Sequence, residues 1–245
     1  MNELKEFLLK NIVWITIALV ILILMISVFS SRKRIVKIYD KYLTINLSSG
    51  LTGVVFAKYL IDSLNLPIRL AKAPGKYNDA YVSKAKAICL SEEVLSSSSV
   101  ASVAIIAHEM GHALQDSTKD ARFNFNHAMR KITKFTNKFI FPLLVTALCF
   151  WIFKWPTDIA WITALAIDGG LLLLHIISNF SFIPIERDAS RRGLALLKKY
   201  ANLTNSEFRH CQKLLRVAGQ TYIAHFFDDF FMFSTIKKYL YKTYS

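Results

Sequence analysis

Residues 100–115 read VASVAIIAHEMGHALQ and carry the most specific pattern in the chain. Two of their residues, His108 and His112, stand four positions apart, so on a helix the two side chains share one face, one turn apart. Two imidazoles in this arrangement can bind one metal ion, and Glu109 beside them can act as general base on a water molecule. The pattern therefore predicts a hydrolytic site with Zn²⁺ as cofactor, on a helix that one of the serines at 96–99 caps.

A catalytic zinc site needs a third protein ligand, and this helix supplies only two. Glu186 lies in PIERDASRR, residues 184–192, at the start of an expected helix that follows a long apolar block. A carboxylate there is also stabilised by the helix dipole and by neighbouring arginines, so from the residues alone Glu186 is equally well a metal ligand or a helix-terminal charge. The other groups that could complete the site are Asp188, His127, His175, His210 and His225.

An apolar run at residues 11–29 is long enough to cross most of a bilayer core of roughly 30 Å. The stretch before it is charge-balanced and the stretch after it is basic, which favours an uncleaved transmembrane anchor over a signal peptide. Under the positive-inside rule, the cations that follow place the N-terminus outside and the rest of the chain in the cytoplasm. These cations are Arg32, Lys33, Arg34, Lys37 and Lys41.

A second apolar block at residues 140–183 is interrupted by Lys154, Pro156 and Asp158, as expected of two antiparallel membrane helices joined by a turn. Cations flank the block on both sides, which again places the flanking segments in the cytoplasm. The membrane pattern accounts for most of the net charge of +14 and predicts a lipid bilayer, and no nucleic acid, as partner. The flanking cations are Arg130, Lys131, Lys134, Lys138, Arg187, Arg191 and Arg192.

We therefore expect a mainly α chain with a small β element (α+β), a metallopeptidase integrated in the membrane by about three transmembrane helices. A strand is expected at 80–90, and helices at 54–64 and from Pro184 to about residue 200; Thr204 and Glu207 have the spacing of a capping box that starts another helix. The expected parts are an N-terminal anchor (1–31), a cytoplasmic catalytic part (32–138), a transmembrane hairpin (139–183) and C-terminal cytoplasmic helices (184–245).

Four segments resemble the YugP-type membrane zinc metallopeptidases, which belong with the HtpX and Ste24 peptidases in the glutamate-zincin group. They are SGLTG (49–53), NDAYVSKAKAICLSEEV (78–94), SSVASVAIIAHEMGHALQ (98–115) and PIERDASRR (184–192). The resemblance covers most of the chain after the first apolar run. It implies a membrane-integrated, zincin-like metallopeptidase in which Glu186 is the third zinc ligand. Ser190 stands where the wider group typically has Asp, although Ser fits the YugP-type pattern, and Ala80 stands where family members often have His.

The expected strand at 80–90 resembles the edge strand against which zincins bind extended substrates, so Asp79, Ala80 and Tyr81 are candidate substrate-binding residues. An ordinary packed strand would have the same sequence pattern. For the oxyanion of the transition state, the candidate donors are Arg191, Arg192, Tyr222 and His225.

These patterns predict a zinc metallopeptidase of a bacterial-type cell membrane, expected to be an endopeptidase acting on proteins or peptides on the cytoplasmic side. One alternative is an intramembrane protease of the site-2 type with Asp168 as ligand, but the apolar run around the HEMGH motif spans only about 22 Å. Another is a non-catalytic membrane scaffold that binds zinc, in which Glu109 would have little purpose. The sequence leaves the oligomeric state open.

Overall fold

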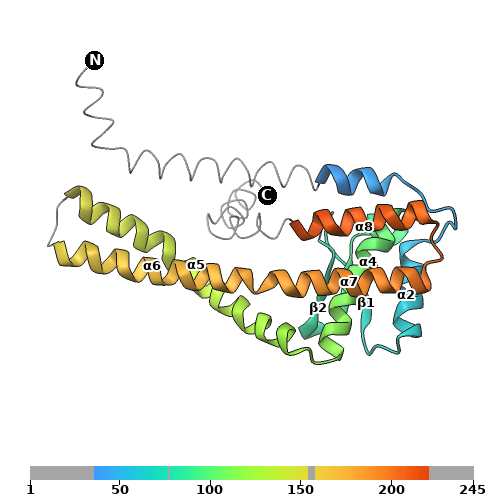
Figure 1. Ribbon diagram of the computed structural model, residues 1–245, viewed down its shortest axis with the longest axis horizontal. Coiled ribbons are helices and arrows are strands. Elements are labelled where there is room, and N and C mark those ends of the chain that lie inside the picture. Colours follow the sequence, from blue (N-terminus) through green and yellow to red (C-terminus); the bar gives the residue numbers. More distant parts are fainter. Residues whose placement is uncertain (1–35, 77, 154–157, 221–245) are drawn as a thin grey trace, which may run out of the picture.

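The structure is a computed structural model, and it describes residues 36–76, 78–153 and 158–220. Helices pack around a small sheet at one end, and a long helical hairpin of α5 (Ala121–Phe153) and α6 (Asp158–Phe180) projects from them (Figure 1). Helix α7 (Phe182–Tyr200) continues almost directly from α6 and returns the chain to the helical body. This path places the residues after the hairpin beside those before it.

The centre of the body is α4 (Val100–Ser117), which carries the HEMGH motif. Its N-cap is Ser99, whose side chain accepts a hydrogen bond from the backbone N–H of Ser102, as the run of serines predicted. The helix is buried on nearly all sides because α2 (Gly53–Ser63), α3 (Glu92–Ser96), α7 and α8 (Asn205–Gln220) pack around it. The motif thus lies on a helix held from several directions.

The sheet has three strands in the order β1 (Arg69–Lys72), β3 (Ala87–Leu90), β2 (Ala80–Val82). Strand β1 is parallel to β3, and β2 is antiparallel to it. The prediction of one strand over 80–90 is wrong in its middle, because a short 3₁₀ turn, η1 (Ser83–Ala85), reverses the chain there. Lys86 closes that turn with a left-handed φ of +45°. The reversal leaves β2 as an edge strand next to α4.

Helices α4 and α7 approach closely because small residues line their contact. A side chain at Gly193 on α7 would place its Cβ 2.8 Å from the carbonyl oxygen of Ala107 on α4. A Cβ at Gly111 on α4 would likewise meet the backbone of Ala189 on α7. Ala107 and Gly111 thus let another helix come close to the motif. This contact sets the distance between the motif and the residues of α7.

The capping box predicted at Thr204 and Glu207 is confirmed at the start of α8. The carboxylate of Glu207 accepts hydrogen bonds from the backbone N–H and the hydroxyl of Thr204, at 2.7 and 2.8 Å. It also accepts one from the backbone N–H of Ser48, at 2.6 Å. One buried carboxylate thereby ties α8 to the segment that precedes α2.

The block at 140–183 forms two packed helices, although α5 begins well before the block, at Ala121. No helix within the described parts of the chain has both the length and the apolar character that a membrane crossing requires. The span predicted at 11–29 lies outside the described residues. Apolar side chains are nonetheless exposed along the hairpin, among them Phe135, Phe139, Ile159, Ile162, Leu173, Ile177 and Phe180.

Candidate metal centre

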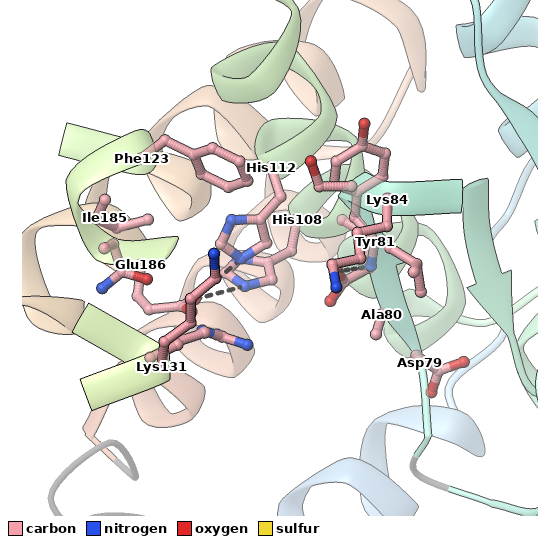
Figure 2. Close-up of a pocket in the computed structure, with 15 residues that line it drawn as sticks. Asp79, Ala80, Tyr81, Lys84, His108, His112, Phe123, Lys131, Ile185 and Glu186 are labelled. Atoms are coloured by element: carbon pink, nitrogen blue, oxygen red, sulfur yellow. Dashed lines mark hydrogen bonds and ion pairs between the residues drawn. The ribbon is translucent and has the colours of Figure 1, made fainter. Parts of the chain in front are cut away.

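Three side chains meet where α4 contacts the first turns of α7: His108, His112 and Glu186. A carboxylate oxygen of Glu186 lies 3.2 Å from Nε2 of His108 and 3.1 Å from Nε2 of His112. Potential ligand atoms of the three residues all lie within 4.8 Å of one another. Figure 2 shows both imidazoles and the Glu186 carboxylate converging on one point. Two histidines and one carboxylate are a donor set that catalytic zinc uses.

The ring of His112 is oriented by Gln115, one turn further along α4. The Gln115 amide nitrogen donates to the carbonyl of Ile185 and to the carboxylate of Asp188, at 2.8 and 3.0 Å. Its amide oxygen therefore faces Nδ1 of His112, at 3.0 Å, and Nδ1 must donate to it. This contact assigns the proton of the neutral ring to Nδ1 and leaves the lone pair of Nε2 facing Glu186.

The ring of His108 is oriented by Ser190, whose hydroxyl lies 3.2 Å from Nδ1. Ser190 stands four residues after Glu186, at the position where the wider glutamate-zincin group typically has Asp. A hydroxyl can accept from Nδ1 as a carboxylate does, but without a negative charge. Ser190 therefore makes the contact with the imidazole of His108 although it replaces the Asp that is typical of the group.

Electrostatics at the three residues suit a cation. Burial opposes the charged form of Glu186, but its attraction to His112 and its hydrogen bonds with both histidines lower its pKa well below the usual value. Burial likewise opposes the charge on His112, yet Glu186 outweighs it and raises the pKa to about 9. A neutral Nε2 and a carboxylate oxygen at 3.1 Å are both acceptors, so only a shared proton or a shared cation makes the contact favourable. The residues thus fit a bound metal ion.

Glu109 lies buried beside the group and contacts the edge strand. Its carboxylate accepts a hydrogen bond of 2.7 Å from the backbone N–H of Tyr81 on β2. Burial raises its pKa, while His108, His112 and the Tyr81 N–H act in the opposite direction. A carboxylate with a raised pKa next to a metal site has the position and the proton affinity of a general base.

A cavity of about 590 Å³ opens over this centre. One wall is the edge strand and its turn, and the other is the first part of α5 (Figure 2). The candidate substrate-binding residues Asp79, Ala80 and Tyr81 all line it. The carboxylate of Asp79 is already engaged, because it accepts hydrogen bonds from Ser91 and from the hydroxyl of Tyr39. The hydrogen bonds of Asp79 are therefore made to other residues of the chain, and those from Ser91 join the residue before β2 to the segment after β3.

Comparison with known proteins identifies the family. Residues 15–238 match the family described as "Putative neutral zinc metallopeptidase". The chain belongs to this family. The chain is also similar to a protein of Bacillus subtilis (strain 168) named "Putative membrane protease YugP", with 26% identity over 200 residues, 80% of this chain and 84% of that protein. No solved structure matches.

Membership of this zinc metallopeptidase family confirms the predicted resemblance and implies a peptide substrate. Among the described residues, the only group of His, Cys, Asp and Glu side chains close enough to share an ion is that of His108, His112 and Glu186. Asp188 instead bonds to Gln115, and the ring of His210 packs against Tyr42. His225 and Tyr222, like the side chains of His127 and His175, lie outside what the structure describes.

Two features of the site were not predicted from the sequence. The candidate oxyanion donors Arg191 and Arg192 are ion-paired with Asp188 and do not line the cavity, whereas Arg130 and Lys131 do. Gln115 was missed as the partner of His112, although its position three residues after the histidine places both on one helix face. For the cations of α5 no sequence signal was available, because their place depends on how α5 packs beside α7.

Proposed function

We propose that the chain is a membrane-anchored zinc peptidase in which His108, His112 and Glu186 hold the metal and Glu109 is the general base. The observation that carries the proposal is the convergence of two imidazoles and a carboxylate within 4.8 Å, each histidine being oriented through its second ring nitrogen. Such outer partners fix the tautomer of a ligand histidine and are typical of metal sites. Family membership supports zinc as the ion.

The residues of the chain divide the chemistry between them. Zinc in a site of this kind supplies a Lewis acid that activates water and polarises the scissile carbonyl. Glu109 takes a proton from the attacking water and returns it to the leaving amine. The Tyr81 N–H holds the carboxylate of Glu109 toward the cavity, so the base is positioned by the same strand that borders the substrate.

The substrate, in this proposal, is an extended peptide that lies along β2. The N–H of Tyr81 points to the open edge of the strand, toward Glu109, and in an antiparallel pair both main-chain groups of one residue face the same side. The Tyr81 carbonyl is therefore available to accept an N–H of the peptide. Binding through main-chain groups demands little of the peptide's sequence and leaves both its ends free, which supports endopeptidase activity.

Membrane attachment, in this proposal, comes from residues 11–29, with the active site in the cytoplasm and the N-terminus outside. The distribution of Lys and Arg supports that orientation. The exposed apolar side chains of α5 and α6 support contact of the hairpin with lipid, because such side chains are rarely gathered on a surface that faces water. The relative from Bacillus subtilis is itself named a membrane protease.

The two alternatives lack comparable support. A site-2-type protease would use Asp168, which lies on α6 and is absent from the group of potential ligands among the described residues. A non-catalytic scaffold would have no use for a buried Glu109 held at the metal group by Tyr81.

Zinc content and casein cleavage of the detergent-purified full chain test the proposal. Glu186→Gln is expected to lose bound zinc and cleavage, whereas Glu109→Gln keeps zinc and loses cleavage. Asp168→Asn, the matched control, is expected to keep both. Loss of zinc in Asp168→Asn with retention in Glu186→Gln would favour the site-2 alternative, and undiminished cleavage by Glu109→Gln would exclude Glu109 as the base.

A further inference from the structure

Three cations line the cavity: Lys84 in the turn after β2, and Arg130 and Lys131 on α5. None of them has an ion-pair partner among the described residues. Lys86, two residues after Lys84, ion-pairs with Asp116 at 2.7 Å, and Arg122 on α5 ion-pairs with Asp120 at 2.9 Å. Cations near the cavity are thus paired with acids of the protein, whereas those that face into it are not.

Among the described residues, no ion pair joins the three acidic side chains of the cavity to these cations. Asp79 accepts hydrogen bonds from Ser91 and from Tyr39. Glu109 accepts from the backbone of Tyr81, and Glu186 contacts both imidazoles of the metal group. A divalent ion held there would add further positive charge. With such an ion bound, the positive charges of the cavity would outnumber its three carboxylates and would create a positive field for an entering ligand.

Helix geometry explains why Arg130 faces this cavity. Phe123, Asn126 and Arg130 follow one another at spacings of three and four, so they share one face of α5, and all three line the cavity. The guanidinium of Arg130 lies 4.9 Å from the centre of the Phe182 ring, one helical turn before Glu186 on α7. This stacking holds a planar donor near the ligand-bearing turn. Figure 2 shows Lys131 on the Glu186 side of the two histidines and Lys84 on the Tyr81 side.

We propose that Arg130 and Lys131 form a subsite for a peptide carboxylate close to the scissile bond, and that Lys84 strengthens its field from the opposite wall. The inference rests on the proposed peptidase function and names its substrate class. A guanidinium binds a carboxylate through two parallel hydrogen bonds, and its cost of desolvation is lower than that of an ammonium group. The carboxylate comes from an Asp or Glu side chain or from the C-terminus of the peptide.

Cleavage of matched peptides by the full chain in detergent tests the subsite. Cleavage sites are first mapped by mass spectrometry on a digest of unfolded casein. One preferred site is then made as four synthetic peptides, with Glu or Gln beside the scissile bond and with a free or an amidated C-terminus. The wild type is expected to favour the carboxylate form by about fivefold in kcat/KM, the upper end of what an exposed ion pair typically contributes. Preference for Glu assigns a side-chain carboxylate, and preference for the free C-terminus assigns a terminal one.

The variant Arg130→Glu with Lys131→Glu is expected to reverse the preference, and the milder Arg130→Gln with Lys131→Gln is expected to abolish it. Lys198→Glu with Lys199→Glu is the matched control: it changes the net charge equally, at the exposed last turn of α7, and is expected to keep the preference. Binding to the inactive Glu109→Gln chain, measured by fluorescence anisotropy, is expected to show the same order of peptides without any turnover.

Several outcomes would overturn the subsite. One is that the wild type cleaves all four peptides equally while the Glu109→Gln variant cleaves none of them. That result would contradict the subsite but not the peptidase function. Another is that the Lys198 and Lys199 control loses the preference for the carboxylate form as completely as the Arg130 and Lys131 variant does. If the latter variant weakens binding only to vesicles of anionic phospholipid and leaves peptide preference unchanged, these cations hold lipid headgroups instead. If Glu109→Gln cleaves as the wild type does, the proposed function fails first.

Discussion

The helical body around α4 and the α5–α6 hairpin satisfy opposite requirements. In the body, apolar side chains such as Phe56, Ile106 and Met110 are fully buried, and buried polar groups such as Gln115 have several hydrogen-bond partners. Along the hairpin, by contrast, large apolar side chains such as Phe135, Ile159 and Phe180 are exposed. The body is thus stabilised by close packing of its own side chains, whereas the exposed apolar surface of the hairpin needs an apolar environment or partner.

The same contrast appears at their glycines. Gly111 in the body is enclosed by the backbone of α7, whereas Gly169 on α6 has nothing within 4 Å of the place a Cβ would take. Close packing in the body brings the metal ligands together, so substitutions there should lower both the free energy of unfolding and the affinity for metal. Substitutions in the hairpin should change both quantities much less. The predictions below test this division, from the largest effect to the smallest.

The largest effect is expected for Gly111→Ala. The added methyl group would meet the backbone around Ala189, which no rotamer change can relieve, so α4 and α7 must move apart. We expect a loss of about 3 kcal/mol in the free energy of unfolding, together with loss of zinc, because Glu186 moves with α7. Urea unfolding in detergent and elemental analysis measure the two effects. A variant with wild-type stability and zinc content would show that the contact between the two helices does not set the site.

Gln115→Ala should weaken zinc binding without unfolding the body. The substitution removes the acceptor that holds Nδ1 of His112 and leaves Asp188 with its two arginines. Loss of a partner of this kind typically reduces metal affinity 10- to 100-fold, so we expect a reduction of about that size. Competition with a zinc chelator measures it. Ser117→Ala on the exposed last turn of α4 is the control, and an equal loss in both variants would contradict the role given to Gln115.

Acid should destabilise the body through Glu207. Burial opposes its charge, but hydrogen bonds from the backbones of Ser48 and Thr204 outweigh this and lower its pKa from 4.5 to about 2. Because the pKa is lower in the folded state, the stabilisation is complete above pH 4.5 and is lost as the pH falls toward 2. We expect Glu207→Gln to be less stable than wild type by about 2 kcal/mol at pH 7 and by less than half of that at pH 3. Urea unfolding at the two pH values tests it, and a gap that does not change with pH would contradict it.

The sequence predicted those parts of the body whose cause is local. The spacing of His108 and His112, the cap at Ser99 and the capping box at Thr204 each depend on residues within one or two turns, and in each case the predicted helix or cap is present. The turn at Lys86 was missed because a left-handed φ at a lysine has no marker such as glycine or asparagine. Strand β1 was missed because it forms only by pairing with β3.

Residues that depend on the packing of distant helices could not be predicted from spacing. Glu186 joins His108 only because Gly111 and Gly193 let α7 approach α4, and the residues alone left it open between a ligand and a helix-terminal charge. The resemblance to a family of metallopeptidases supplied that assignment in advance. Nothing comparable pointed to Arg130, whose place depends on the packing of α5 beside α7.

The smallest effect is expected for Gly169→Ala in the hairpin. Apart from the helix's own backbone, no atom of the described residues lies within 4 Å of the added methyl group, so we expect no packing cost. Alanine is also favoured over glycine inside a helix by about 1 kcal/mol. We therefore expect a rise of at most a few degrees in the thermal midpoint in detergent, with zinc content and cleavage unchanged. Destabilisation as large as that of Gly111→Ala would mean that a partner covers α6 at this point. The hairpin would then depend on close packing as the body does, and the division between the two regions would not hold.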